Sequence, residues 1–516
     1  MQGSPQPSRS GSDPQRSDED LESEKAGVLV SRSRSSPKIP WSFFPCDYQM
    51  HKMLLEFSHY FNDHVCPELV IVDSPMNPHR MDLDILPYVP DFLLSLLVSV
   101  SAIHQVIQSQ PNWDLITLNR SQALRDKHHG ELEPLQSFRH PLSSLIYKYR
   151  SRSLRGLNQY LSETGAEGPD LVFHTVTVML MSEIQRSAFC NWKIHFEGLK
   201  NIIACQGGFE VLVSTRLANL RYALSHFMLI DVMSSLFMAA SCLPLDTPSQ
   251  LRYIDWLPEL HSDGLEKGFP CPDELLACII HTNNLRFILH HHPYDDMAHV
   301  NSAILDLVRN IITFSPTAWA ERAFESYNER LEERVDRQRP RKRLDLVPQP
   351  VEGEGWADLA SAFQVATLLY CLRALVLNHG KESILQELLD SLYEGVIPDV
   401  QCLASVTLSN LLCMLHPLMD QPLQKGRSMG RSMFWPVLMA GLESACSFEA
   451  LSERPFIVSS LQELCRCLGD MSALDAAVFL QSAWSIDEEK HSGNMLRVRT
   501  WDDLFEGMGV HGVFFF

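Results

Sequence analysis

The fold of this chain is decided by the stretch Trp192-Lys-Ile-His-Phe-Glu-Gly-Leu-Lys-Asn-Ile-Ile-Ala-Cys-Gln-Gly-Gly208. Large side chains recur in it every three or four positions, so they share one face of a helix. These side chains are Trp192, His195, Leu199, Ile202 and Ile203. The Gly207-Gly208 pair supplies the left-handed backbone that ends a helix at low cost. The stretch therefore predicts a buried helix with a glycine stop.

The same helical spacing continues on both sides of this stretch. From Trp41 onward, apolar segments of roughly 12 to 20 residues follow one another and are separated by Pro and Gly. Alternating strand patterns and internal repeats of fixed period are not found. We therefore expect an all-α fold, a large irregular multi-helix domain over residues 41–516. Loop-rich interruptions are expected near 246–273 and 328–355.

Residues 1–40 differ from the rest in composition. They are rich in Ser, Pro, Gln and mixed charge, and they lack apolar clusters, so we predict a disordered N-terminal tail. They also lack the apolar core of a signal peptide. The chain as a whole is 45% hydrophobic and 21% charged, which is typical of a soluble globular protein.

Net charge and cysteine content indicate the partners and the cellular compartment of the protein. The net charge of −20 indicates that most of the surface meets water or proteins, because a protein that grips DNA phosphates is usually basic. Thirteen cysteines without paired spacing fit a reducing compartment. The apolar run 91–108 is interrupted by serines, His104 and Gln105, so we expect a buried helix and no membrane partner.

Several motifs resemble one protein family. The pattern Trp-x-x-His-x-x-Gly-x-x-x-Ile-x-x-x-x-Gly-Gly at 192–208 resembles a segment of the regulatory domain of fungal transcription factors, which usually also carry a six-cysteine zinc cluster. Phe434-Trp-Pro, continuing through Ala440-Gly441 to Ala445, is similar to the Trp-Pro helix of that family, with Ser444 inserted. Other segments agree in the expected order, and the resemblance covers roughly residues 45–516. They are residues 54–57, 77–78, 92–107, 149–157, 172–183, 231–237, 244, 483–484, 501–504 and 509–513.

The resemblance implies a function. It implies a nuclear transcriptional regulator of a metabolic or secondary-metabolite pathway, in which a small-molecule effector or a protein partner shifts the population of two helix arrangements. It also implies protein partners, as a homodimer or heterodimer. Two alternatives remain open. One is a co-regulator that acts only through protein partners without touching DNA, and the other, less favoured, is a helical enzyme.

The zinc cluster of that family is absent from this sequence. A six-cysteine cluster needs two Cys-x-x-Cys units, because its thiolates must converge to about 2.3 Å from each metal ion. Cys46 and Cys66 stand alone, and Cys465 and Cys467 are separated by one residue. Zinc is therefore expected only if a missing N-terminal cluster exists, and DNA as a partner is not supported by this chain.

No residue is assigned a catalytic, metal-binding or cofactor-binding role. His290-His291-His292 would splay by about 200° around a helix, so we expect a helix-end cluster and not a metal site. Glu183 and His195 would form an acid–base pair if their helices adjoined, although a histidine on an apolar face is more often part of the core. We expect Trp192, Trp435 and Trp484 to be core anchors as well, and Ala440 with Gly441 to permit close approach of two helices.

One basic cluster remains as a candidate site. It consists of Arg337, Arg339, Arg341, Lys342 and Arg343. One interpretation is a nuclear-localisation element or a phosphate-contacting patch. The other interpretation is a solvated charged linker between helices, and it is favoured because short basic runs are common in proteins.

Overall fold

The computed structural model describes a helical protein. It describes residues 48–506 except for 72, 74–76, 78, 127–139, 165–168, 265–267, 293–296, 339–354, 395, 421–428, 447–449 and 491–499. None of the described residues lies in a strand, so the expected all-α fold class is confirmed. The tail predicted to be disordered, residues 1–40, lies outside the described residues.

Long helices alternate with short 3-10 and π segments. The helices of the first half are α1 (Tyr48–Tyr60), α2 (Asp91–Gln108), α3 (Trp113–Arg125), α5 (Ser143–Thr164), α6 (Pro169–Arg186), α7 (Trp192–Cys205) and α8 (Phe209–Ser234). Those of the second half are α9 (Leu257–Leu260), α10 (Asp273–His291), α11 (Met297–Thr313), α12 (Pro316–Gln338), α13 (Trp356–Cys371), α14 (Gln386–Tyr393), α15 (Val400–Asp420), α16 (Phe434–Cys446), α17 (Arg454–Leu468), α18 (Met471–Lys490) and α19 (Trp501–Glu506). The short segments are η3 (Phe61–Val65), η4 (Cys66–Leu69), η5 (Leu83–Tyr88), η7 (Ser235–Phe237), η8 (Ala240–Cys242), η9 (Thr247–Trp256), η10 (Ser262–Gly264), η11 (Leu372–Val376), η12 (Leu377–His379), η13 (Glu382–Leu385), η14 (Met429–Ser432) and η15 (Leu451–Glu453).

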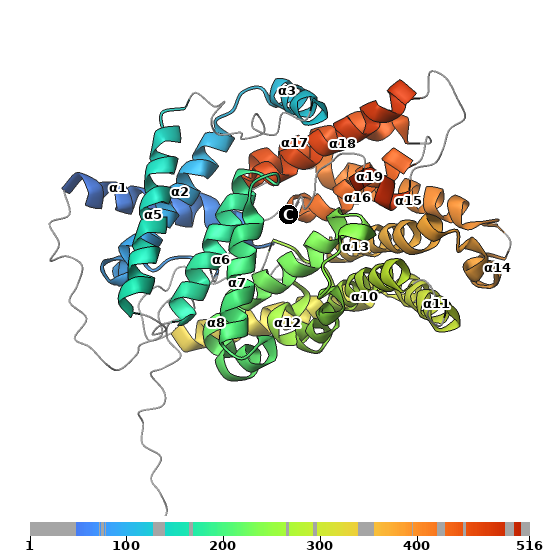
Figure 1. Cartoon of the computed structure of the whole chain (residues 1–516), viewed down its shortest axis with the longest axis horizontal. Helices are drawn as coiled ribbons and strands as arrows, with labels where there is room; N and C mark the ends of the chain where they lie inside the picture. Colours follow the sequence, from blue (N-terminus) through green and yellow to red (C-terminus); the bar gives the residue numbers. More distant parts are fainter. Residues whose placement is uncertain are drawn as a thin grey trace, which may run out of the picture.

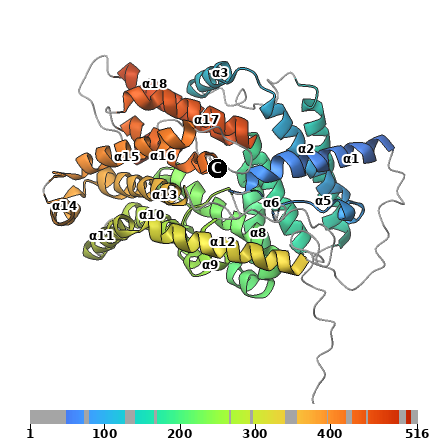
Figure 2. The ribbon, with the colours of Figure 1, turned by 180° about the vertical axis from the view of Figure 1, so that it is seen from behind.

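Helices from distant parts of the sequence share one core. The N-terminal helices α1, α2 and α5 lie at one end of the molecule, whereas α14 and α15 lie at the other (Figures 1 and 2). Between these ends, α13 packs against α10, α11, α12, α15 and α16, and α18 packs against α3, α6, α16 and α17. One hydrophobic cluster runs from Leu54 to Phe505, so the first and last described helices are tied to the same interior.

The stretch at 192–208 forms the predicted helix and stop. Trp192, Leu199 and Ile203 are buried on one face of α7, joined by Phe196, while His195 is only partly buried. Both glycines that follow have positive φ, +95° at 207 and +102° at 208. The N–H of Gly208 donates to the carbonyl of Ile203 at 2.9 Å, which satisfies one carbonyl of the last turn.

Within the described part of the chain, three helical stretches are long and apolar enough to cross a membrane by length and composition. In the structure, 78% of the window Asp91–Gln108, 83% of that in Trp356–His379 and 44% of that in Val400–Asp420 are buried inside the protein. Helix α2 is buried, as expected, and its His104 and Ser101 form hydrogen bonds with α1. Its buried His104 accepts or donates a hydrogen bond with the hydroxyl of Tyr60 at 2.8 Å. Burial in the protein core explains the apolar composition of α2 and of the helix that begins at Trp356.

The two predicted interruptions differ in structure. Segment 246–273 is made largely of the short helices η9, α9 and η10. Prolines in the first turns of η9 and α9 limit their extension, because proline cannot donate to the preceding turn. In the second interruption, α12 continues to Gln338, and residues 339–354 lie outside the described part of the chain.

Helices α16 and α18 approach closely at Gly441, as expected. A Cβ at position 441 would lie only 2.3 Å from Cδ1 of Leu480. The indole N–H of Trp484 donates to the carbonyl of Gly441 at 3.3 Å, and Trp435 is also buried. The predictions that Trp192, Trp435 and Trp484 anchor the core and that a small residue permits this contact are confirmed.

Two glycines in helices should therefore respond oppositely to substitution. Gly441→Ala should lower the free energy of unfolding by about 1–3 kcal/mol, because the added methyl overpacks against the buried Leu480. Gly198→Ala in α7 should raise it by about 0.5–1 kcal/mol, because the nearest atom, in Val176, is 4.0 Å away and alanine favours a helix. Urea denaturation followed by circular dichroism measures both. Equal effects of the two variants would contradict this packing.

Buried ion pairs connect helices that are far apart in sequence. The guanidinium of Arg373 in η11 forms two hydrogen bonds with the carboxylate of Glu443 in α16, and both side chains are at most 2% exposed. Asp475 in α18 forms a pair with Arg120 in α3 and accepts a hydrogen bond from the backbone N–H of Ala188 at 2.9 Å. Such pairs fix the register between helices, because each charge is stable in the interior only beside its partner.

Candidate functional site

The C-terminal helix α19 is inserted between helices from the middle of the chain. Its three large apolar side chains, Trp501, Leu504 and Phe505, are almost completely buried. The indole N–H of Trp501 donates to the carbonyl of Leu236 at 3.1 Å, and its ring lies 5.1 Å from that of Tyr370. Six residues cannot sustain a helix alone in water, so α19 owes its structure to these contacts.

Arg286 of α10 lies under α19 with 1% of its side chain exposed. It donates hydrogen bonds to the carbonyls of Ser235 at 2.9 Å and Met238 at 2.6 Å, and to the hydroxyl of Tyr370 at 3.0 Å. Ser235 directly follows the last residue of α8, and Met238 follows η7, where the backbone becomes extended. The arginine thus satisfies the end of α8 and at the same time places a positive charge in the interior.

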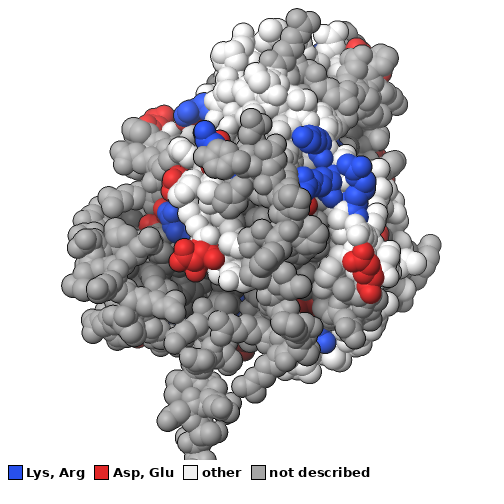
Figure 3. Space-filling model, turned by 90° about the vertical axis from the view of Figure 1, so that its left-hand side faces the viewer, with Lys and Arg blue, Asp and Glu red and all other residues white. Residues whose placement is uncertain are grey.

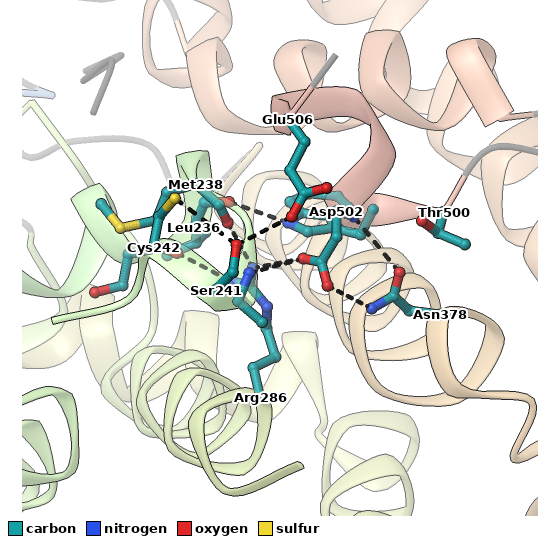
Figure 4. Close-up of polar contacts among 12 residues, drawn as sticks. Leu236, Met238, Ser241, Cys242, Arg286, Asn378, Thr500, Asp502 and Glu506 are labelled. Carbon is teal, nitrogen blue, oxygen red and sulfur yellow. Dashed lines mark hydrogen bonds and ion pairs between the residues drawn. The ribbon is translucent and has the colours of Figure 1, made fainter. Parts of the chain in front are cut away.

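The carboxylate of Asp502 completes this centre (Figure 4). Its Oδ1 lies 3.5 Å from Nη2 of Arg286 and accepts a hydrogen bond from the backbone N–H of Ala240 at 2.9 Å. Its Oδ2 accepts from the side-chain amide of Asn378 at 2.9 Å. One turn later, Glu506 accepts a hydrogen bond from the hydroxyl of Ser241 at 3.0 Å. Helix α19 is therefore held by polar contacts on one side and by apolar side chains on the other.

A buried polar network continues from this centre. The hydroxyl of Tyr370 donates to Asn283 at 2.6 Å, and the amide of Asn283 donates to the side-chain oxygen of Gln250 at 3.1 Å. Gln250 donates in turn to the carbonyl of Asp231 at 2.9 Å, and Tyr253 donates to the Asp231 carboxylate at 2.9 Å. The network therefore connects α19 with α10 and α13 directly, and with η9 and α8 through successive hydrogen bonds.

Asp231 makes this network sensitive to pH. Burial raises the pKa of Asp231 to about 6, against the lowering effects of Lys200 and of the Tyr253 hydrogen bond. The folded state therefore binds the proton more tightly than the unfolded chain, whose aspartate titrates near 3.8. The contribution of this group to stability is full below pH 4 and is lost as the pH rises towards 6.

Replacing Asp231 by Asn should remove this pH dependence. The Tm of the variant minus the Tm of the unmodified protein should increase between pH 4 and pH 6, because only the unmodified protein loses the contribution. Thermal denaturation at half-unit pH steps measures the difference. A difference that stays constant over this range would show that Asp231 does not titrate there.

The pair Glu183–His195 is brought together, but not as an acid–base pair. Nε2 of His195 lies 3.8 Å from Oε1 of Glu183, which is buried. The same carboxylate forms ion pairs with Arg150 of α5 and, at 2.9 Å, with Arg186 of α6. Burial and the charge of Arg150 lower the pKa of His195. A carboxylate held by two guanidinium groups is a poor proton acceptor, so this cluster joins α5, α6 and α7.

The predicted basic patch is not placed by the structure. Arg337 belongs to the last turn of α12, and Arg339, Arg341, Lys342 and Arg343 lie outside the described residues. The patch therefore remains a prediction. The three histidines at 290–292 lie at the C-terminal end of α10, as expected. Among the described residues, no group of three or more His, Cys, Asp or Glu side chains is arranged to hold a metal ion. The described cysteines are all free thiols.

Charges on the face formed by the N-terminal helices are mixed. Helix α5 carries Lys148, Arg152 and Arg155 on its outer side, and Arg152 donates to Asp91 at 2.9 Å. Figure 3 shows that basic groups gather in small clusters on this face, with acidic groups beside them. The described part of this face lacks the long continuous positive surface that tracks DNA phosphates.

Comparison with known proteins shows the family of this chain. The chain is 24% identical over 368 residues to the "Phomenoic acid biosynthesis cluster-specific transcriptional regulator" of Leptosphaeria maculans, which covers 70% of this chain. The match spans 59% of that relative, less than two thirds of its length. No solved structure matches the chain. The model of the fungal specific transcription factor domain matches residues 56–516, which is most of the chain, and the protein therefore belongs to this family.

Proposed function

We propose that this chain is a nuclear transcriptional regulator that controls a metabolic pathway, most specifically a secondary-metabolite pathway. The observation that carries the proposal is the family match over residues 56–516. The similarity to a regulator named for a biosynthesis cluster supports the choice of pathway class. The helical body with its internal polar network supports a regulatory role, because effectors act by shifting populations between two packed arrangements.

Transcript profiling tests this function. Deleting the gene in the organism that encodes it should change the transcript levels of a group of biosynthetic genes at least several-fold. The tagged full-length protein should accumulate in the nucleus and cross-link to chromatin at those genes. A tagged protein outside the nucleus, together with unchanged transcripts, would contradict the proposal.

A second candidate is a co-regulator that acts through protein partners without direct DNA contact. The acidic net charge of this chain favours it, because a surface that binds DNA phosphates is usually basic. A gel-shift assay separates the two, with purified full-length protein alone and together with a zinc-cluster relative. A shift by the protein alone at moderate salt indicates direct contact, and a supershift only with the relative indicates co-regulation.

Catalysis has less support. The family and the relative are described as transcriptional regulators. The acid–base pair suggested by the sequence, Glu183 with His195, is engaged by Arg150 and Arg186. We therefore infer that the protein is not an enzyme.

A further inference from the structure

Asp502 occupies the position of a bound carboxylate. Its two oxygens meet a guanidinium, a backbone N–H and a side-chain amide, from Arg286, Ala240 and Asn378. All three groups donate hydrogen bonds to the carboxylate of Asp502. A guanidinium together with N–H donors is typical of a site that binds a carboxylate. The donors come from α10, η8 and η12, and Ala240 and Asn378 lie 262 and 124 residues before Asp502 in sequence. The site is thus built by the body of the protein, and α19 is its occupant.

The neighbouring contacts of α19 are apolar. Trp501 lies against the ring of Tyr370, and Phe505 stacks on Phe479 with 5.5 Å between ring centroids. Leu504 is fully buried beside them. Helix α19 therefore presents one carboxylate attached to a bulky apolar body. A small molecule with the same two features is an apolar carboxylic acid.

We propose that the Arg286 site recognises an apolar carboxylic acid, which takes the place of Asp502 and releases α19. The proposal rests on the proposed function, because the release would be the signal that the regulator transmits. Three observations favour exchange. The Asp502 side chain is 22% exposed although Arg286 is buried. Nε of Arg286 is buried and has no hydrogen-bond partner among the described residues. The helix to be displaced is six residues long.

Decanoate binding to the full-length protein tests this exchange. Isothermal titration should show saturable binding of decanoate, whereas decanol and acetate, which lack the charge or the apolar body, should bind at least tenfold more weakly. Asp502→Asn should bind decanoate about tenfold more tightly than the unmodified protein, because the internal competitor is weakened. Glu506→Gln is the matched control, since it neutralises a carboxylate of the same helix while its amide oxygen can still accept the hydrogen bond from Ser241, so the contact that holds α19 there is kept. Its affinity should stay within twofold of the unmodified protein.

Hydrogen exchange provides a measurement that needs no variant. Decanoate should accelerate exchange of the 501–506 amides at least tenfold in the unmodified protein, while the amides of α13 stay protected. Decanol binding as tightly as decanoate, unchanged exchange of α19, or equal decanoate affinity of Asp502→Asn and the unmodified protein would each overturn the proposal. None of these results depends on transcript levels, so failure of the acid site and failure of the proposed regulatory function are observed separately.

Discussion

Replacing Glu443 by Gln is expected to lower the free energy of unfolding by about 3–5 kcal/mol. The substitution keeps the shape of the side chain but leaves the guanidinium of Arg373 as an uncompensated charge in the interior. Both groups are among the least exposed polar side chains of the protein. Urea denaturation monitored by tryptophan fluorescence measures the loss.

The matched control removes both charges. The double variant Arg373→Met with Glu443→Leu should recover most of the stability, because replacing a buried ion pair by apolar residues of similar volume is often neutral. A single variant that loses less than about 1 kcal/mol would show that Arg373 reaches water or another anion, and the described packing of η11 against α16 would then be wrong.

Gly469→Ala is expected to destabilise the protein by about 3 kcal/mol or more. Gly469 ends α17 with φ of +61°, which costs an L-residue strain. A Cβ there would also lie 2.1 Å from Cδ2 of the buried His104 in α2. The ring of His104 is held by the hydroxyl of Tyr60, so it cannot move aside freely. Thermal denaturation by circular dichroism measures the effect.

Gly380 offers a control, because an alanine there would have the same backbone strain but its Cβ would not contact a neighbouring side chain. Its φ is +62°, and no atom lies within 4 Å of an added Cβ. Gly380→Ala should therefore cost only about 1–2 kcal/mol, the penalty of the left-handed conformation. Equal losses at positions 380 and 469 would contradict the close contact between the end of α17 and α2.

The sequence was informative where the signal is local. Helix α7 could be predicted from the spacing of Trp192, Leu199 and Ile203 and from the glycines that follow, because both periodicity and stop lie within one stretch. Helix α2 could be predicted as buried from its apolar run. The close approach at Gly441 could be predicted from a small residue in an apolar helix.

The α19 site could not be predicted, because its residues come from separate regions of the chain. Arg286 offered one signal, a charged residue between Leu285 and Phe287 in an apolar helix, which indicates a buried arginine with partners. The identity of those partners depends on tertiary packing. The same limit applies to Glu183. The sequence suggests that Glu183 pairs with His195 if their helices adjoin, but it does not indicate that Arg150 of α5 also contacts Glu183.

We propose that docking of α19 on Arg286 controls the activity of this transcriptional regulator. The most direct measurement compares transcript levels of the regulated genes in strains that carry Asp502→Asn or Glu506→Gln at the native locus, with equal protein abundance. Asp502→Asn is expected to change these transcripts at least several-fold, in the same direction as an inducing apolar acid, and Glu506→Gln is expected to leave them unchanged. Unchanged transcripts in the Asp502→Asn strain would show that docking of α19 does not control transcription.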